Sequence, residues 1–309
     1  MSDPVITFVE YSSPNFGSWA LTRTDGVVTQ IRTVSPAWPE DIVSETEFDP
    51  VTGLPVPEDQ PLLAPVALVE MSTDADGTRP WQTEERAFDA DGNLLRITRE
   101  MDNGTVSMRF ETDTDQDIIY RADPADVVGW SVRTEIRDGI SNALQTSSVV
   151  RDDDVFVLSA FDDSGAITGR AFLDLGDTYS WSERVFGYYE DGSLASFLRL
   201  NDNGILTERT FGTDGNLAEQ RVTDTADIRD FEFIDTDVFA DGSRIVLTDF
   251  DDGRLVERVF DADGVLRSRI VEDVDDAYDY ARIEATFDET GALIERIVTP
   301  DPVADELLF

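Results

Sequence analysis

Leu206-Thr-Glu-Arg-Thr-Phe-Gly-Thr-Asp-Gly-Asn-Leu217 recurs 49 residues later as Leu255-Val-Glu-Arg-Val-Phe-Asp-Ala-Asp-Gly-Val-Leu266. A spacing of 49 to 51 residues also separates a series of aromatic residues, Trp81, Trp130, Trp181, Phe231 and Tyr280. Self-similarity at a fixed period indicates a repeat architecture and takes precedence over local motifs. Four full repeats and a truncated fifth therefore run from about residue 66 to residue 299.

Glycine turns divide each repeat into short segments, and most of these glycines follow Asp or Asn. Such pairs favour positive φ at both centres of a type I′ hairpin turn. The runs between them alternate apolar and polar residues, as in Val106-Ser-Met-Arg-Phe110, and none has the stripe of an amphipathic helix. We expect structural turns at Gly92, Gly104, Gly192, Gly204, Gly215, Gly242, Gly253, Gly264 and Gly291. The second repeat has Asn142 and Asp154 at such points, and both residue types tolerate turn geometry.

The predicted fold is therefore all-β: an elongated antiparallel β-meander built from ~49-residue repeats of hairpins, with about four strands each. This repeat domain spans 66–299 and holds about 4.5 units. Residues 1–35 are expected to form an N-terminal strand and hairpin. Residues 36–65 are rich in proline and predict an extended connector rather than packed sheet. The connector can reach the first repeat or a neighbouring chain, so both pairings of the N-terminal strand stay open. Residues 300–309 form a C-terminal tail.

The chain is strongly acidic. Its 309 residues include 66 acidic and 24 basic ones, giving a net charge of −42, and 40% are hydrophobic, which is enough for a core. Charge of this sign repels nucleic-acid backbones and anionic membrane surfaces. No apolar run approaches the roughly 20 residues of a membrane span, and the N-terminus has no Sec-type signal peptide. We therefore expect no nucleic-acid partner and no membrane insertion.

Cys, His and Lys are all absent, and all 24 basic residues are Arg. The usual ligands of zinc, haem and iron–sulfur centres are therefore missing, as are thiol nucleophiles, the base of serine triads and the amine of Schiff-base enzymes. A carboxylate pair for glycoside hydrolysis remains, but 66 acids place some pair at the required separation by abundance alone. We expect no enzymatic activity and no cofactor other than Ca²⁺.

Clusters of Asp around the turn glycines raise the question of calcium, because Ca²⁺ takes carboxylate and carbonyl oxygens in tight turns. None matches an EF-hand loop: Gly92, for example, has Ala87 and Thr98 where that loop needs acids. Hairpin turns explain the clusters without a metal, and weaker, dispersed calcium sites are the alternative. The candidate ligands are Asp89, Asp91, Asp261, Asp263, Asp273, Asp275 and Asp276.

Two further patterns concern the faces of the strands. Adjacent Glu and Arg residues, Glu208-Arg209 and Glu257-Arg258, are expected to form cross-strand ion pairs on a solvated face. The periodic aromatic residue of each repeat is more typical of a core position than of a platform that stacks on sugars.

Phe88-Asp-Ala-Asp-Gly92-Asn-Leu94, Phe260-Asp-Ala-Asp-Gly264-Val-Leu266 and Phe287-Asp-Glu-Thr-Gly291-Ala-Leu293 resemble the core of YD (Rhs-type) repeats and the hairpins of MORN-like bacterial repeats. The pattern over 66–299 is similar to repeat regions of large type I-secreted, RTX-associated bacterial proteins, although their nonapeptide calcium repeats are absent. The terminus Glu306-Leu-Leu-Phe309 resembles the end of some type I secretion signals. These resemblances imply a secreted or cell-surface protein exported without a Sec signal peptide.

Together, these features predict a non-catalytic, exported structural or adhesive β-repeat protein. Its expected partner is itself, in a homo-oligomer or filament on the cell surface or in an extracellular matrix. The alternative is a ligand- or cargo-binding repeat module, which binds a glycan or surface ligand or forms a YD-type shell. A carboxylate-based glycosidase is the third option.

Overall fold

The computed structural model contains strands and turns and no helix in the residues that it describes. These residues are 6–13, 17–24, 27–34, 43–47, 55–56, 64–111 and 116–301, and side chains are described in the last three ranges. The chain falls into two compact units, Met1–Thr178 (the N-terminal unit) and Tyr179–Phe309 (the C-terminal unit). The predicted all-β class and antiparallel meander are confirmed.

A four-stranded antiparallel sheet precedes the repeats, in the order β1-β2-β3-β4. Its strands are β1 (Ile6–Ser13), β2 (Gly17–Thr24), β3 (Val27–Val34) and β4 (Val43–Glu47). β1 pairs with β2 along its whole length. One edge of β1 is therefore paired with β2, and not with the first repeat or a neighbouring chain, the two partners expected from the sequence. The turn at 25–26 and the tail beyond Asp301 lie outside the described residues.

Strand β4 corrects the prediction that residues 36–65 form a connector without packed sheet. It pairs with β3 from Val43↔Val34 to Glu47↔Gln30. The physical reason is local, because no proline lies between Pro39 and Pro50. The backbone N–H groups that a strand must donate are therefore present in this stretch.

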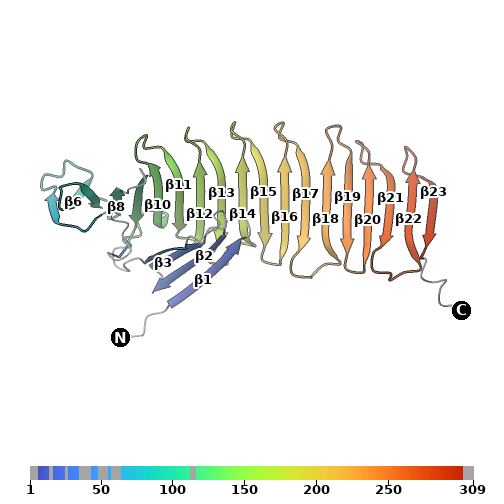
Figure 1. Ribbon diagram of the computed structural model, residues 1–309, viewed down its shortest axis with the longest axis horizontal. Coiled ribbons are helices and arrows are strands. Elements are labelled where there is room, and N and C mark those ends of the chain that lie inside the picture. Colours follow the sequence, from blue (N-terminus) through green and yellow to red (C-terminus); the bar gives the residue numbers. More distant parts are fainter. Residues whose placement is uncertain are drawn as a thin grey trace. The chain divides into compact units, whose positions relative to one another are not determined.

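The N-terminal unit then continues as a meander in which each strand pairs antiparallel with the next (Figure 1). Its strands are β5 (Leu68–Thr73), β6 (Trp81–Phe88), β7 (Leu94–Met101), β8 (Val106–Glu111), β9 (Gln116–Ala122), β10 (Trp130–Asp138), β11 (Leu144–Arg151), β12 (Val155–Phe161) and β13 (Ile167–Asp174).

The C-terminal unit is built in the same way, with ten strands that follow one another in sequence order (Figure 1). They are β14 (Trp181–Tyr188), β15 (Leu194–Asn201), β16 (Ile205–Phe211), β17 (Leu217–Asp224), β18 (Phe231–Val238), β19 (Arg244–Phe250), β20 (Arg254–Phe260), β21 (Leu266–Asp273), β22 (Tyr280–Phe287) and β23 (Leu293–Pro300).

The hairpin turns are in the predicted places but are not of the predicted type I′. In the turn after β6, Gly92 has a φ of 85°, whereas Asp91 does not have positive φ. The Gly92 N–H donates to the Asp89 carbonyl (3.2 Å), and the Asp89 N–H donates to the Asn93 carbonyl (3.0 Å). This is a type I turn followed by a glycine in the left-handed region, the arrangement of a three-residue hairpin with a G1 bulge.

The core is concentrated in the N-terminal unit. Val132, Val150, Phe156 and Leu173 lie directly opposite one another across β10–β13 and form one buried cluster. A second cluster joins β8 and β9 and contains the fully buried Phe110. Alternation along the strands places these residues on one face, as a half-buried sheet requires.

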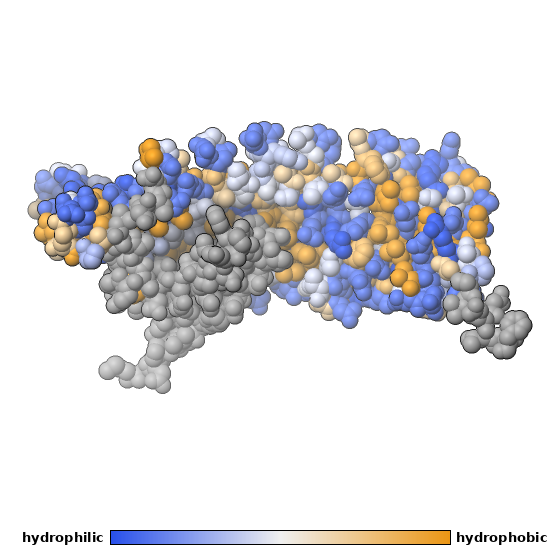
Figure 2. All heavy atoms as spheres, in the orientation of Figure 1, coloured by the Kyte–Doolittle hydropathy of each residue, from blue (hydrophilic) through white to orange (hydrophobic). Residues whose placement is uncertain are grey.

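The C-terminal unit buries far less. Among its described apolar residues only Trp181, Val256 and Val271 are buried. Most other residues of β14–β23 are half-buried or exposed, on both faces of the strands. In the view of Figure 2, apolar and polar residues are interspersed over these strands. The C-terminal unit is therefore a layer of strands with two accessible faces.

Candidate functional site

The predicted turn glycines are confirmed. All nine have positive φ, from 79° at Gly291 to 89° at Gly242. Asn142 and Asp154, which replace glycine in the second repeat, also have positive φ, at 58° and 63°. These positions therefore allow the tight turns that connect the strands.

The first calcium candidates are occupied by their own turns. Asp89 Oδ1 accepts hydrogen bonds from the N–H groups of Asp91 (2.9 Å) and Asn93 (2.8 Å). The side chain and then the backbone of Asn93 lower the pKa of Asp89. Asp261 Oδ1 accepts in the same way from Asp263 and Val265. An aspartate that opens a type I turn is stabilised by these bonds without a metal.

The remaining candidates belong to a longer loop, between β21 and β22. Asp273 accepts from the N–H groups of Ala277 (3.0 Å) and Tyr278 (2.7 Å), and Asp276 has a φ of 54°. The structure does not bring these residues together with Asp275 as a ligand set. In the described part of the chain, no three acidic side chains converge on a point where a metal ion would be held. Calcium binding stays a prediction.

The long loops repeat a feature that the sequence analysis missed. An Asp stands seven residues before each periodic aromatic residue and accepts a backbone N–H from inside its own loop: Asp74, Asp123, Asp174, Asp224 and Asp273. Four residues before each aromatic residue, the chain has positive φ: Gly77, Asp126, Asp177, Asp227 and Asp276. The pattern Asp-x-x-Asp/Gly-x-x-x-aromatic could have been found by aligning the repeats on the aromatic position.

The periodic aromatic residues begin the strands β6, β10, β14, β18 and β22, and a register shift follows each of them directly. A bulge of this kind turns the side chain to the other face. Trp81 and Trp181 are buried, as a core position predicts, whereas the other three are half-buried. The Arg184 guanidinium stacks on the Trp181 ring at 4.3 Å, a favourable cation–π contact.

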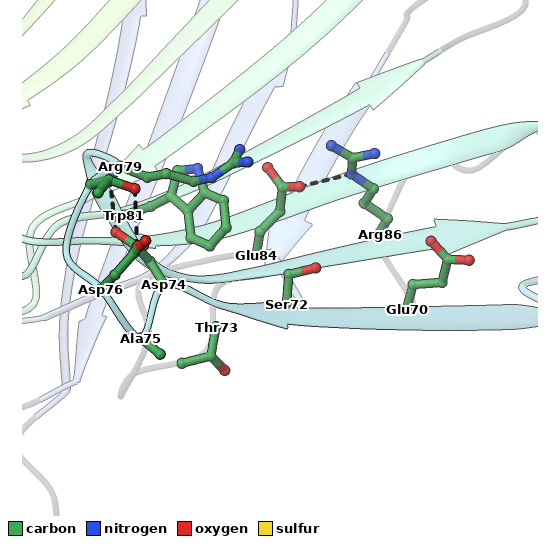
Figure 3. Close-up of a pocket in the computed structure, with 11 residues that line it drawn as sticks. Glu70, Ser72, Thr73, Asp74, Ala75, Asp76, Arg79, Trp81, Glu84 and Arg86 are labelled. Atoms are coloured by element: carbon green, nitrogen blue, oxygen red, sulfur yellow. Dashed lines mark hydrogen bonds and ion pairs between the residues drawn. The ribbon is translucent and has the colours of Figure 1, made fainter.

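A groove of about 620 Å³ lies beside β5 and β6, next to Trp81 (Figure 3). Glu84 is 4% exposed and binds two guanidinium groups, those of Arg86 (2.8 Å) and Arg99 (2.7 Å). Burial alone would raise the pKa of Glu84, but these two arginines hold it below its usual value. The carboxylate is therefore ionised and already neutralised by its neighbours.

Glu135, which is 1% exposed in the middle of β10, is also surrounded by guanidinium groups, three instead of two. It binds Arg121, Arg133 (2.8 Å) and Arg137 (2.9 Å). Arg121 and Arg133 lie directly opposite on β9 and β10, so Glu135 separates two like charges that would otherwise repel each other. Burial opposes ionisation of Glu135, yet the three arginines lower its pKa.

In the C-terminal unit the cross-strand ion pairs predicted for Glu208-Arg209 and Glu257-Arg258 do not form among the described side chains. Glu208 lies directly opposite Arg221, but Arg221 pairs with Asp235 (3.2 Å). Neighbours in a strand point to opposite faces, so each glutamate lies on one face and its arginine on the other. Arg209 donates instead to Gln220 Oε1 (2.8 Å), and Arg258 to Thr248 Oγ1 (3.3 Å).

The register of β14–β23 extends this separation over the whole unit. One face, called the arginine face, carries Arg184, Arg199, Arg209, Arg258, Arg269 and Arg296 and has no acidic residue away from the strand ends. The opposite face, called the acid face, carries Glu208, Glu219, Asp235, Asp237, Asp249, Glu257, Glu272, Glu284 and Glu295, besides the buried Glu183.

Like charges meet directly on the arginine face. Arg184 lies opposite Arg199, and Arg258 lies opposite Arg269. Burial, and then the neighbouring guanidinium, lower the pKa of Arg184 and of Arg258. The Nε–H groups of Arg184, Arg199 and Arg269 are buried and find no acceptor in the part of the chain that the structure describes. A carboxylate, sulfate or phosphate placed between them would satisfy these groups.

A groove of about 300 Å³ opens on this face between β20 and β23. Arg254, Arg269 and Arg296 line it together with Tyr280 and Phe287, over a floor that includes the buried Val271. Arg254 is paired with Asp252 (2.6 Å), whereas no carboxylate is within ion-pair distance of Arg269 or Arg296 among the described side chains. The groove combines positive charge with aromatic surface.

Among the described residues, Glu183 is the one acid with a strongly raised pKa. It is 3% exposed and lies opposite Leu200 on β15, and burial raises its pKa to about 7. Glycoside hydrolysis needs a second carboxyl group across a substrate cleft. Glu183 lines neither of the two grooves described above.

No family model matches this chain, and no curated protein matches it. The resemblance to YD, MORN-like and RTX-associated repeats therefore stays a prediction from the motifs. No helix among the described residues is long and apolar enough to cross a membrane.

Proposed function

We propose that this protein is a non-catalytic structural or adhesive β-repeat protein that associates with copies of itself. The observation that carries the proposal is the C-terminal unit, whose ten strands bury only Trp181, Val256 and Val271 among their apolar residues. A layer with two accessible faces gains stability when another layer covers it, at roughly 25 cal/mol for each Å² of apolar surface. The C-terminal unit of a second copy is a sheet of the same width and can therefore cover the first one.

The last strand of the C-terminal unit supports the same proposal. All eight residues of β23 are exposed, and Ile294 is 67% exposed. Leu293, Ile297 and Val298 are exposed as well. Glu295, Arg296 and Pro300 discourage pairing along the edge of β23, whereas the exposed apolar side chains on its faces mark an interaction surface.

Sedimentation velocity of the full-length chain in 0.15 M salt tests the proposal, over protein concentrations of about 1 to 100 µM. We expect the weight-average mass to rise with concentration above the 34.4 kDa of one chain, and electron micrographs to show ordered particles. A single 34.4 kDa species at every concentration contradicts it. Export to the cell surface or to an extracellular matrix is part of the proposal and rests on the resemblance to type I-secreted proteins.

The groove beside Tyr280 favours a second candidate function, the binding of an acidic glycan. Guanidinium groups bind carboxylates and sulfates, and aromatic rings stack on the faces of sugars. Calorimetry should then detect binding of a uronate-containing polysaccharide but not of a neutral one. The double variant Arg269→Gln/Arg296→Gln should weaken it about tenfold, while Arg282→Gln on the acid face should not. Equal binding of both polysaccharides would exclude this candidate.

A further inference from the structure

The charges of the two faces of the C-terminal unit match in position. Glu208-Arg209 on β16 and Glu257-Arg258 on β20 occupy equivalent places in successive repeats, with the acid on one face and the base on the other. The two glutamates are therefore as far apart as the two arginines, about 19 Å for four strand spacings. A displacement of one residue along the strands, about 3.3 Å, superimposes these two glutamates on these two arginines.

We infer that the arginine face of the C-terminal unit docks on the acid face of the C-terminal unit of a second copy, so that copies stack face to face. The inference rests on the proposed function and names the surfaces through which self-association occurs. The contact is heterologous, because each copy offers its arginine face to one neighbour and its acid face to the next. Repetition of the contact builds a stack rather than a closed dimer.

The state of the charges within one copy supports this partner. The ion pairs of the acid face, Arg221 with Asp235 and Arg282 with Glu272 and Glu284, leave Glu208, Glu257 and Glu295 without an arginine within ion-pair distance among the described residues. Among the described residues, the six arginines named above for the other face likewise have no carboxylate within that distance, whereas Arg254 at the start of β20 pairs with Asp252. Each surplus is compensated by the opposite face of a neighbouring copy.

The size of the surface and its apolar residues also suit this partner. Ten strands about 4.8 Å apart, each of seven or eight residues, present about 1,000 Å² on each copy, as much as a stable interface requires. Val222, Ile234, Ile283 and Val298 follow one row of the arginine face, and Leu255 and Phe233 lie on the acid face. Two sheets packed about 10 Å apart bury such rows, whereas a flexible polyanion would leave them wet.

Charge reversal on the full-length chain tests the inference. In the docked pair, Arg209→Glu/Arg258→Glu places acids opposite Glu208 and Glu257 of the neighbouring copy, and Glu208→Arg/Glu257→Arg places arginines opposite Arg209 and Arg258. Each variant alone should lose self-association, with an association constant lowered at least about tenfold in sedimentation. An equimolar mixture should assemble again, because each altered face then meets a complementary one. Far-UV circular dichroism and thermal melts verify that both variants are folded.

A milder variant keeps the test informative if a reversed chain fails to fold. Ala285 lies directly opposite both Arg269 and Arg296. Ala285→Glu supplies these arginines with a carboxylate of their own chain, so it should raise the melting temperature and weaken self-association at least about tenfold. Ala285→Gln, of similar size but neutral, should leave self-association within about threefold of the wild type.

The outcomes separate this inference from the proposed function. If the wild type assembles and the reversed variants assemble equally well, the docking of these faces is wrong and self-association occurs elsewhere. If the reversed variants are monomeric and their mixture stays monomeric, the arginine face binds something other than the acid face, and the inference is overturned. A wild type that never assembles overturns both.

Discussion

The two units repeat the same hairpin design but treat their arginines differently. In the N-terminal unit, the opposed pair Arg121 and Arg133 shares the buried carboxylate of Glu135. In the C-terminal unit, the opposed pairs Arg184/Arg199 and Arg258/Arg269 have no such carboxylate among the residues that the structure describes. Phe186, two residues after Arg184, stands where Glu135 follows Arg133. The N-terminal unit therefore neutralises this opposed arginine pair within one chain, and we infer that the C-terminal unit leaves its opposed pairs for a partner.

The N-terminal unit also buries more of its apolar side chains than the C-terminal unit does. The N-terminal unit contains both apolar clusters, and the C-terminal unit contains neither. An apolar core and internally paired charges are what a sheet needs to be stable alone. Their scarcity over β14–β23 indicates that the C-terminal unit is stabilised in part by what covers it.

The largest expected effect comes from breaking the arginine cluster of the N-terminal unit. Glu135→Gln should lower the free energy of unfolding by about 3 kcal/mol, because three guanidinium groups lose their shared carboxylate. Glu257→Gln on the acid face should change it by less than about 0.5 kcal/mol. Urea titrations of both variants at low protein concentration measure the difference. Equal effects would remove the contrast between the units.

A second prediction concerns the buried carboxyl of the C-terminal unit. The pKa of Glu183 is raised from its usual 4.5 to about 7, so the folded state retains a proton that the unfolded state releases. Stability from this group is complete below about pH 4.5 and is lost as the pH rises to about 7. The shift corresponds to about 3 kcal/mol, part of which the buried amide of Gln also costs.

Glu183→Gln should therefore stabilise the protein by about 2 kcal/mol at pH 8 and by much less at pH 5. Thermal melts of the variant and the wild type at both pH values provide the measurement. A gain of the same size at both pH values would show that Glu183 is ionised in the folded protein.

The smallest effect should be the same in both units, because they share their turns. A Cβ at Gly104 would lie 3.0 Å from Ala125 Cβ, and one at Gly253 would lie 2.8 Å from Asp275 Cβ. Both glycines have positive φ. Gly104→Ala and Gly253→Ala should each cost on the order of 1 kcal/mol or slightly more. If the two substitutions lower the free energy of unfolding by different amounts, the units differ in their turns as well as in their charges and cores.

The sequence was sufficient to predict the strands and turns, because Gly92 and its equivalents require positive φ at a fixed period. The turn type could not be predicted from Asp-Gly alone, since the carboxylate of Asp89, two residues earlier, selects a type I turn with a bulge. The bulge after each periodic aromatic residue shifts the alternation by one position. A face could therefore be assigned to Arg209 or Arg258 only once the register of the strands was known.

The candidate site was predicted less well for a related reason. Asp261 and Asp273 were candidate ligands because acidic clusters resemble calcium loops, whereas their side chains accept hydrogen bonds from their own turns. The groups that lack a carboxylate partner among the described residues are the six arginines named for the arginine face, and this lack depends on what stands opposite them in the neighbouring strands. Thr207 and Ala285, for example, occupy positions where a carboxylate would complete a cluster. That no carboxylate stands opposite these arginines can be recognised only once the pairing of the strands is known.

The most direct test of the account is a single chain that carries both charge reversals, Glu208→Arg, Arg209→Glu, Glu257→Arg and Arg258→Glu. Its two faces have exchanged charges at matching points, so copies should stack as the wild type does. We predict an association constant within about threefold of the wild type in sedimentation velocity, although each pair of substitutions alone should lower it at least about tenfold. If the chain with all four substitutions is folded and remains monomeric, the complementarity of the two faces is not what joins the copies.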